Sequence, residues 1–382
     1  MPRLKTKPTS VNADALEAFR QRGVQSTLLD ARLEFMEVEG TRRYVEGLVG
    51  QERCYPDMLP TQKSGRWSTT DPPLVNFPIA CIAPDCPKPK PHPTTDRECS
   101  GWSARDIITL DKGEWGLKWD LDGVEARLFS AYAGDDEDIQ AFREGLDLHT
   151  ITCCRVYELP LPPDLRNPHT SPSCAAWRAQ VGWEGKEDKR RVTSKNLRYG
   201  VLQYGINEKA ASEIRDIEKL GLTRTQLFER AKRLLDSKPK YTAFKRLTWG
   251  QVIEQRETRT FLGRKRRFYP SRQEVDTWRR RGIPGDEAKS GLNHRIQGAV
   301  ADIMNLTLIG ILVDLYPEGT LHLNAHDGAF VGFPVSLRPE DVIPAVTPII
   351  ARVWDVEDHK VPITASGVLL RGGQSERVVF NV

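Results

Sequence analysis

Two aspartates, Asp120 and Asp327, stand where metal-dependent chemistry is expected. Asp120 ends the segment WGLKWD (115–120), which alternates like a strand, and Asp327 lies between two short apolar runs, LHLNA and AFVGF, which predict a hairpin with a polar tip. Two carboxylates from separate elements can converge on hard divalent cations, which prefer oxygen ligands. A single aspartate at a strand end is also a common cap or turn residue, so the pair by itself leaves both interpretations open.

A second set of residues is suited to a polyphosphate. Arg191, Lys195 and Tyr199 are spaced four apart, so they share one face of the helix predicted over 189–204. Two cations one turn apart repel each other unless an anion lies between them, and the tyrosine ring adds a flat surface for a base or sugar. This face suits a nucleoside triphosphate. The alternative is a solvated basic helix face.

Two further groups of side chains are candidates for binding. Asn293 and Gln297 are one helical turn apart, and two amides on one face can read acceptors in a minor groove or be ordinary surface residues. Four soft ligands could bind Zn²⁺ tetrahedrally within a Pro-rich stretch, although their spacing differs from that of common zinc fingers. They are Cys81, Cys86, His92 and Cys99. A plain loop with reduced thiols is the alternative.

The pattern along the chain predicts an α+β fold, a small antiparallel sheet with helices around it. Helices are expected over 13–50, from Val124 to a stop at Gly134, and over 189–204, 208–236 and 287–316. Pro-rich insertions are expected over 56–103 and 159–188. Cys153 and Cys154 follow on a helix and are expected in the core.

Composition and charge limit the classes of protein to which this chain can belong. With 39% hydrophobic residues in 382, wholesale disorder is excluded. The longest apolar stretch, Ala299 to Tyr316, contains Asp302 and Asp314 and predicts a buried helix, so no membrane partner is expected. Seven cysteines without a secretory signal indicate reduced thiols in a cytoplasmic location. Residues 186–247 carry 17 bases and 8 acids, a surface suited to a polyanion or merely solvated.

Six segments, in order along the chain, resemble motifs of the family A DNA polymerases, the bacterial DNA polymerase I type. Motif A and the helices after it resemble WDLDGVEARLFSAYAG and the residues that follow as far as DLHT. Motif B resembles RRVTSKNLRYGVLQYG, and motif C resembles NAHDGAFVGF. SGRWSTTDPPLVNFP is similar to the palm segment before motif A, FLGRKRRFYP to the Leu-Gly-Arg-rich turn, and LNHRIQGAVADIM to the helix that contacts the primer–template minor groove. Six motifs in one order are far more specific than any one alone.

The resemblance implies a two-metal active site in a polymerase right hand. Asp120 and Asp327 would bind two Mg²⁺ ions, with the backbone carbonyl of Leu121 as a further ligand. One ion would lower the pKa of the primer 3′-hydroxyl, and the other would neutralise the triphosphate and the leaving pyrophosphate. Lys195 would protonate the pyrophosphate.

The resemblance also implies the binding residues. Arg191, Lys195 and His149 would contact the phosphates of a dNTP. Tyr199 would stack under the nucleotide, and Glu125 would be the steric gate that excludes a ribose 2′-hydroxyl. The expected contacts to primer–template DNA are Arg66, Asn76, Asn293, Gln297 and His326.

The implied domains are a partial thumb (1–55), palm with the Cys- and Pro-rich insertion (56–150), fingers (151–285) and palm (286–382). The motifs consume nearly the whole chain, so a proofreading exonuclease domain is not expected. A processivity or exonuclease partner would be a separate subunit.

Three positions depart from the family pattern or extend it. Motif C usually reads His-Asp-Glu, but Gly328 stands in place of the Glu. In motif B one extra residue separates Lys195 from Tyr204, so either the helix contains a bulge or Gln203 takes the place of the family's tyrosine. Asp122 either caps the helix that begins near Gly123, which is the expected role, or adds negative charge near the metals in place of the missing Glu.

These features together predict a template-directed DNA-dependent DNA polymerase that extends a primer with dNTPs in a bacterial or phage-infected cell. Two alternatives stay open. A single-subunit RNA polymerase shares the three motifs, although Glu125 and the DLHT segment favour the DNA enzyme. A non-catalytic nucleic-acid-binding relic would account for Gly328, although the retention of Asp120 and Asp327 opposes it.

Overall fold

The computed structural model describes residues 48, 57–59, 64–70, 74, 109–203, 223–371 and 374–382. The chain divides into two compact units, residues 61–66 with 112–382 and residues 1–60 with 67–111. In the smaller unit, strands β1 (Asp57–Leu59) and β2 (Ser68–Thr70) form an antiparallel pair. Asn76, the four candidate zinc ligands and nearly all of the helix expected over 13–50 lie outside the described residues and stay predictions.

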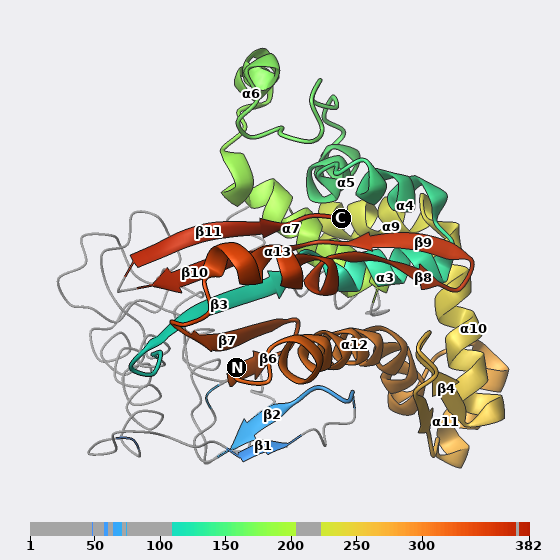
Figure 1. Cartoon of the computed structure of the whole chain (residues 1–382). Helices are drawn as coiled ribbons and strands as arrows, with labels where there is room; N and C mark the ends of the chain where they lie inside the picture. The colour runs from blue at the N-terminus through green and yellow to red at the C-terminus, as the bar shows by residue number, and fades with distance from the viewer. Residues whose placement is uncertain are drawn as a thin grey trace, which may run out of the picture. The chain divides into compact units, whose positions relative to one another are not determined.

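The centre of the larger unit is a five-stranded antiparallel sheet (Figure 1). Its strand order is β11 (Gln374–Phe380), β10 (Ala365–Arg371), β3 (Glu114–Leu121), β7 (Gly328–Pro334) and β6 (Thr320–Ala325). β3 is the central strand because it pairs with β10 on one side and β7 on the other. Leu117, Trp119 and Leu121 alternate with exposed polar residues, so one face of the strand is buried. The predicted strand, the predicted hairpin and the α+β fold are confirmed.

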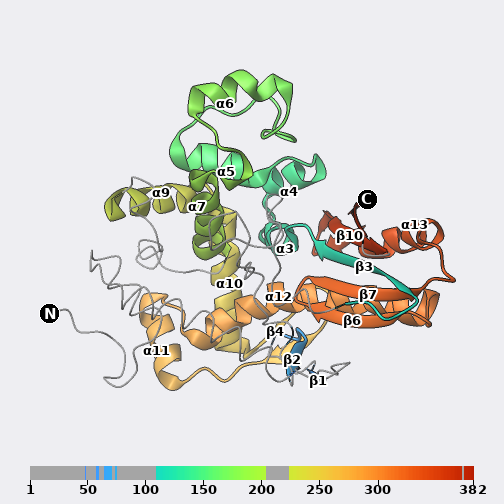
Figure 2. The ribbon, with the colours of Figure 1, turned by 90° about the vertical axis from the view of Figure 1, so that its left-hand side faces the viewer.

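The described part of the larger unit also contains helices. They are α3 (Val124–Ala133), α4 (Asp136–Arg143), α5 (Leu148–Tyr157), α6 (Ala175–Val181), α7 (Lys189–Leu197), α9 (Arg224–Asp236), α10 (Pro239–Gln255), α11 (Arg272–Arg281), α12 (Asp286–Ile309) and α13 (Pro339–Ile350). Two strand pairs, β4 (Glu257–Arg259) with β5 (Lys265–Arg267) and β8 (Arg352–Val356) with β9 (His359–Ile363), complete the unit. Figure 2 shows α5, α6, α7 and α9 gathered beyond α3, away from the sheet.

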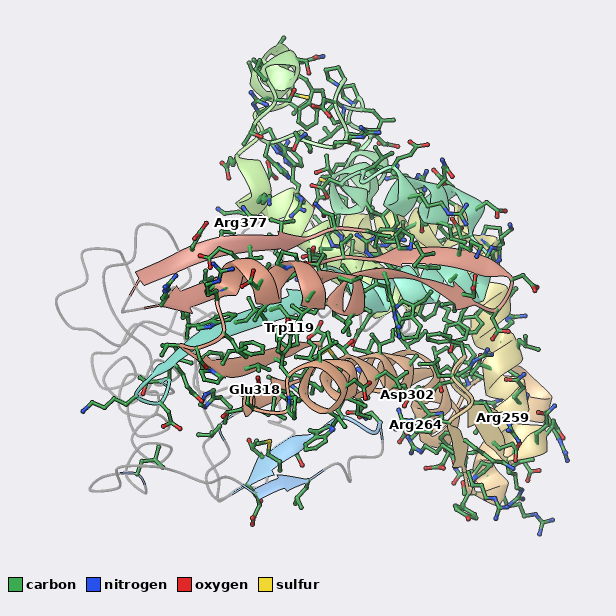
Figure 3. The ribbon with its side chains drawn as sticks, in the orientation of Figure 1. Trp119, Arg259, Arg264, Asp302, Glu318 and Arg377 are labelled. Atoms are coloured by element: carbon green, nitrogen blue, oxygen red, sulfur yellow. The ribbon has the colours of Figure 1, made fainter. Side chains whose placement is uncertain are left out.

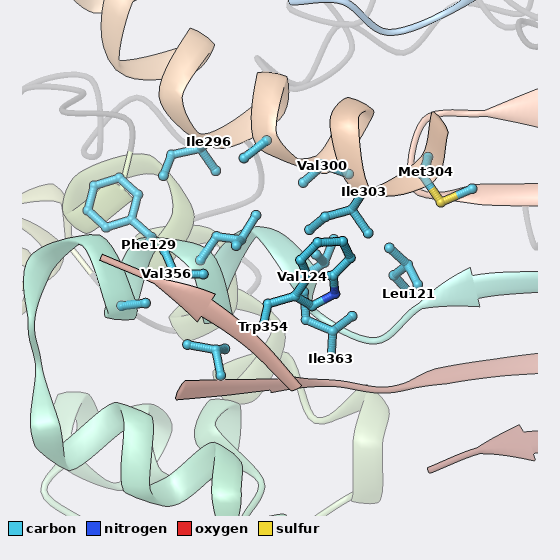
Figure 4. Close-up of a cluster of buried hydrophobic side chains, with 14 of the residues drawn as sticks. Leu121, Val124, Phe129, Ile296, Val300, Ile303, Met304, Trp354, Val356 and Ile363 are labelled. Carbon is cyan, nitrogen blue, oxygen red and sulfur yellow. The ribbon is translucent and has the colours of Figure 1, made fainter. Parts of the chain in front are cut away.

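The long helix α12 and the π-helical turn η7 (Gly310–Leu315) run through the core. Together they are long and apolar enough, by length and composition alone, to cross a membrane. Here Ile296, Val300 and Ile303 are buried against side chains of β3, α3 and the β8–β9 pair (Figure 4). The buried helix predicted over this stretch is confirmed, since core burial accounts for its composition.

The second Pro-rich insertion, 159–188, is folded. It contains the short turns η3 (Pro172–Cys174) and η4 (Gly185–Glu187) on either side of α6. A small apolar cluster fixes it to α5. Its buried members are Cys153, Cys154, Cys174, Trp177 and Trp183. Cys153 and Cys154 are therefore core residues, as expected.

Candidate active site

Asp120 and Asp327 lie next to each other at the ends of adjacent strands. In the register of β3 with β7, Asp120 pairs with Gly328, the residue after Asp327. The backbone N–H of Leu121 donates to the carbonyl of Asp327 over 2.9 Å. The antiparallel sheet thus brings together two aspartates that are far apart in the sequence.

The carboxylates concentrate negative charge. Partial burial, the charge of Asp327 and then that of Asp122 raise the pKa of Asp120 to about 6, against a smaller opposing effect of Lys118. The Asp120 side chain nevertheless keeps an exposed edge, as a metal ligand requires. Oxygen donors that repel one another in this way fit a hard divalent cation such as Mg²⁺, because the cation compensates their charge.

Asp122 does not cap α3, so that expectation was wrong. The N-cap is Gly123, which adopts the left-handed conformation (φ 56°) at the turn from strand to helix. The Asp122 carboxylate instead accepts from the hydroxyls of Ser366 over 2.8 Å and Thr364 over 3.2 Å. Two hydroxyls, one between β9 and β10 and one near the start of β10, therefore hold this third carboxylate close enough to Asp120 to shift the pKa of that residue.

Motif B contains a π-helical bulge, which is one of the two alternatives that its extra residue left open. α7 ends at Leu197 and continues directly as the π-helical turn η5 (Arg198–Gln203). A π-turn accommodates one more residue than an α-turn, and such turns are frequent at functional sites. Tyr204 itself lies outside the described residues, so its role is still a prediction.

The helix face of motif B brings the expected nucleotide-binding residues together. His149, on α5, has its ring centroid 5.9 Å from that of Tyr199. Burial, and then the nearby charge of Arg191, hold the pKa of His149 down at about 3, with a smaller effect of Lys195. His149 is therefore neutral, and its buried Nδ1 has no hydrogen-bond partner in the described part of the chain. Lys195 is exposed.

Glu125 and Arg66 form an ion pair between this helix face and the carboxylates. Arg66 Nη2 lies 2.5 Å from Glu125 Oε1, and both side chains are largely buried. Burial raises the pKa of Glu125, and Asp327 adds to the shift, although Arg66 opposes it. Burial raises the pKa of Tyr199 too, followed by the charge of Glu125. Glu125 thus lies within electrostatic range of both Tyr199 and Asp327.

Three of the expected DNA contacts lie on two separate elements. Asn293 and Gln297 are half-buried on α12, and His326 is exposed at the hairpin tip with φ 61°. On the same helix, Asp302 forms an ion pair with Arg264 at 2.7 Å (Figure 3). Arg264 also donates to the carbonyl of Gly298 and thereby fastens the Arg-rich turn to α12.

A second acidic cluster is already neutralised by the protein. Asp135, Glu137 and Asp138 place carboxylate oxygens within 4.8 Å of one another. The ammonium of Lys238, 1% exposed, lies 2.9, 2.7 and 2.8 Å from them. The buried guanidinium of Arg198, at the start of η5, pairs with Asp138 as well. These cations do what a metal would do, so we assign no metal to this cluster.

Several residues around the site were not predicted from the sequence. Asp147 caps α5 by accepting from the backbone N–H groups of His149 and Thr150, and it also binds Arg191 Nη2 at 3.1 Å. Its position two residues before His149, at a helix start, was a detectable capping signal. Ser366 and the Arg198–Asp138 pair carried no such local signal.

Comparison with known proteins shows which proteins this chain is similar to. No family model matches the chain. DNA polymerase I, thermostable, of Thermus thermophilus is 24% identical over 361 residues, which is 92% of this chain and 37% of the relative. DNA polymerase I of Geobacillus stearothermophilus is 25% identical over 348 residues, 87% of this chain and 34% of the relative. The chain thus spans little more than a third of the length of these curated relatives.

A solved structure of a DNA polymerase domain has the same fold as this chain. The POL domain of Pol1 from M. smegmatis, in a complex with DNA primer–template and dNTP, matches with a TM-score of 0.70 at 20% identity. The match covers 97% of this chain and 58% of that one. The chain is therefore similar in sequence to bacterial DNA polymerase I proteins and has the fold of the POL domain of Pol1.

Proposed function

We propose that the chain is a template-directed DNA polymerase that extends a primer with dNTPs. The observation that carries this proposal is the meeting of Asp120 and Asp327 at the ends of β3 and β7, with Glu125 and Tyr199 close enough to Asp327 for its charge to raise the pKa of each. The relatives and the structural neighbour, which are named as DNA polymerases, support the same reaction.

Asp120 and Asp327, with the Leu121 carbonyl, would hold the two Mg²⁺ ions. When bound, these ions activate the primer 3′-hydroxyl and stabilise the charge that develops on the triphosphate. The protein's own part is to position the substrates. Arg191 and Lys195 on α7 orient the triphosphate, because cations one turn apart on a helix match successive phosphates.

The neutral state of His149 fits a hydrogen-bonding role on the phosphates. A ring whose pKa is near 3 donates an N–H without adding positive charge at neutral pH. Glu125, held by Arg66, would meet the sugar edge of the nucleotide and exclude a ribose 2′-hydroxyl. Lys195, exposed on the same helix face, would supply the proton to the leaving pyrophosphate.

The test is primer extension on a DNA template with dNTPs and Mg²⁺. We expect extension by the wild type, its loss on chelation with EDTA, and its loss in Asp120→Asn and in Asp327→Asn. Asp355→Asn is the matched control and should keep full activity, because this exposed aspartate on β8 pairs with exposed Lys360, its one ion-pair partner among the described residues.

A parallel reaction with NTPs separates the two polymerase classes. We expect little extension with NTPs by the wild type and more in Glu125→Ala, since removing the side chain opens space at the 2′ position. Efficient extension with NTPs by the wild type would instead indicate an RNA polymerase. Failure of all extension by a folded protein would indicate a non-catalytic relic. The bacterial relatives support a cytoplasmic location for this activity.

A further inference from the structure

The insertion 159–188 contacts Asp147, the residue that binds Arg191. His169 Nε2 lies 2.8 Å from Asp147 Oδ2, and the side chains of the two residues are only 9% and 13% exposed. The backbone N–H of Asp147 also donates to the carbonyl of Leu165, over 2.7 Å. The insertion therefore holds Asp147 by both its backbone and its side chain.

The proton on His169 is fixed by a third residue. Trp183 Nε1 lies 3.1 Å from His169 Nδ1. An indole N–H can only donate, so Nδ1 accepts and carries no proton. The proton of the neutral ring is then on Nε2, where it is donated to Asp147. Trp183 thus selects the tautomer that binds the carboxylate, which is how buried partners commonly orient a histidine.

Asp147 in turn holds two residues of the proposed phosphate site. Its two carboxylate oxygens each lie 3.1 Å from Arg191 Nη2. As the N-cap of α5 it also accepts from the backbone N–H of His149. If the carboxylate rotated, the Arg191 guanidinium and the first turn of α5 would lose their shared anchor.

We infer that His169, oriented by Trp183, is a positioning residue that holds Arg191 through Asp147 and so sets the affinity for the triphosphate. The inference rests on the proposed polymerase function and deepens it by giving the insertion a role in binding the nucleotide. His169 itself does not touch the substrate. Its effect is to fix the guanidinium before the nucleotide arrives, which lowers the ordering cost of binding.

The test is steady-state kinetics of primer extension, with dNTP varied, in His169→Ala, His169→Gln and Trp183→Phe. We expect His169→Ala to raise the KM for dNTP about tenfold and to change kcat less than about twofold. His169→Gln should recover most of the affinity, because its amide can still donate to Asp147. Trp183→Phe should raise the KM about threefold, since only the choice of tautomer is lost.

Trp177→Phe is the matched control. Trp177 is buried in the same small cluster, its ring 5.0 Å from that of Trp183, and its indole N–H donates to the carbonyl of Pro160 at 2.7 Å. This variant should lose comparable stability but keep the wild-type KM for dNTP. In His169→Ala, the KM for pyrophosphate in the reverse reaction should rise together with the KM for dNTP. The Kd of the same variant for primer–template should not change.

Three results would overturn the inference: a wild-type KM for dNTP in His169→Ala, an equal rise in Trp177→Phe, or no recovery in His169→Gln. Any of these in a protein whose wild type extends primers would remove the positioning role alone. A wild type that does not extend primers would remove the proposed function and the inference with it.

Discussion

A β-carbon on Gly328 would lie 2.8 Å from Asp120 Oδ1 and 2.6 Å from the carbonyl oxygen of Trp119. The glycine therefore lets β7 and the Asp120 carboxylate approach more closely than any other residue would allow. A glutamate at this position, as the family's motif C usually has, would need the carboxylate or the strand to move. Gly328→Glu is accordingly not expected to improve the site.

Gly328→Ala should lower kcat for primer extension by about tenfold or more, because small misplacements of catalytic groups have large effects. The Kd for primer–template should stay near that of the wild type, which separates this effect from a general loss of structure. Gly250→Ala on α10, where the nearest atom to an added β-carbon is 4.0 Å away, should be silent in the same assay. A fully active Gly328→Ala would show that the strands have room to adjust.

Asp122→Asn should raise the Mg²⁺ concentration needed for half-maximal extension several-fold. An asparagine can still accept from the hydroxyls of Ser366 and Thr364, so the local structure should persist. The negative charge near Asp120 is lost, however, and the attraction for a cation weakens with it. Mg²⁺ titration of extension measures this, and an unchanged titration would leave Asp122 with a structural role only.

Arg198→Met should lower the free energy of unfolding by about 3 kcal/mol, because it removes one partner from a buried ionic cluster. Arg198 is 1% exposed and pairs with Asp138 and with the hydroxyl of Tyr241 at 2.8 Å. Arg233→Met, which breaks an exposed pair with Glu158, should cost less than about 1 kcal/mol. Urea denaturation of both variants measures the two changes in the free energy of unfolding. Equal changes would show that the buried ion pair contributes no more to stability than the exposed one.

Stability should decline below pH 6.5 in part because of His294. This ring is buried, its Nδ1 lies 2.9 Å from Thr258 Oγ1, and burial followed by the charge of Arg264 lowers its pKa to about 3. In the unfolded chain His294 binds a proton below pH 6.5, whereas in the folded chain it stays neutral until the pH falls to about 3. The unfolding free energy therefore falls with pH in that window, by up to about 1.4 kcal/mol per pH unit for one such group.

His294→Gln should flatten this slope, whatever it does to stability at pH 7. The measurement is the unfolding free energy from urea denaturation at several pH values between 7 and 4. Part of the slope should remain, because His149 has a similarly lowered pKa. A slope identical to that of the wild type would show that His294 takes up its proton while the protein is folded.

Local sequence patterns were sufficient for the elements that carry the two central aspartates. The strand ending at Asp120 alternates with a period of two, and Asp327 separates two apolar runs, so both elements are defined by their own residues. The sequence also offered the bulge in motif B as one of two alternatives, because one extra residue in a helix has few structural solutions.

Contacts between segments that are distant in the sequence could not be predicted from local patterns. β10 and β11 were not predicted, yet β10 pairs with β3 along Asp120 and supplies Ser366 to Asp122. The cap assigned to Asp122 failed for this reason, since its partners come from more than 200 residues further along. His169 likewise stands in an insertion whose Pro-rich sequence indicated only a loop.

The π-turn η5 has a consequence for how sequences of this kind are aligned. An additional residue in an ordinary helix would rotate every later side chain by about 100° around the axis. A wider turn absorbs that rotation within Arg198–Gln203. Arg191 and Lys195 precede the wide turn, so their spacing is that of an ordinary α-helix. An alignment of motif B should therefore place the extra residue of this chain within Arg198–Gln203 rather than at either end of the motif.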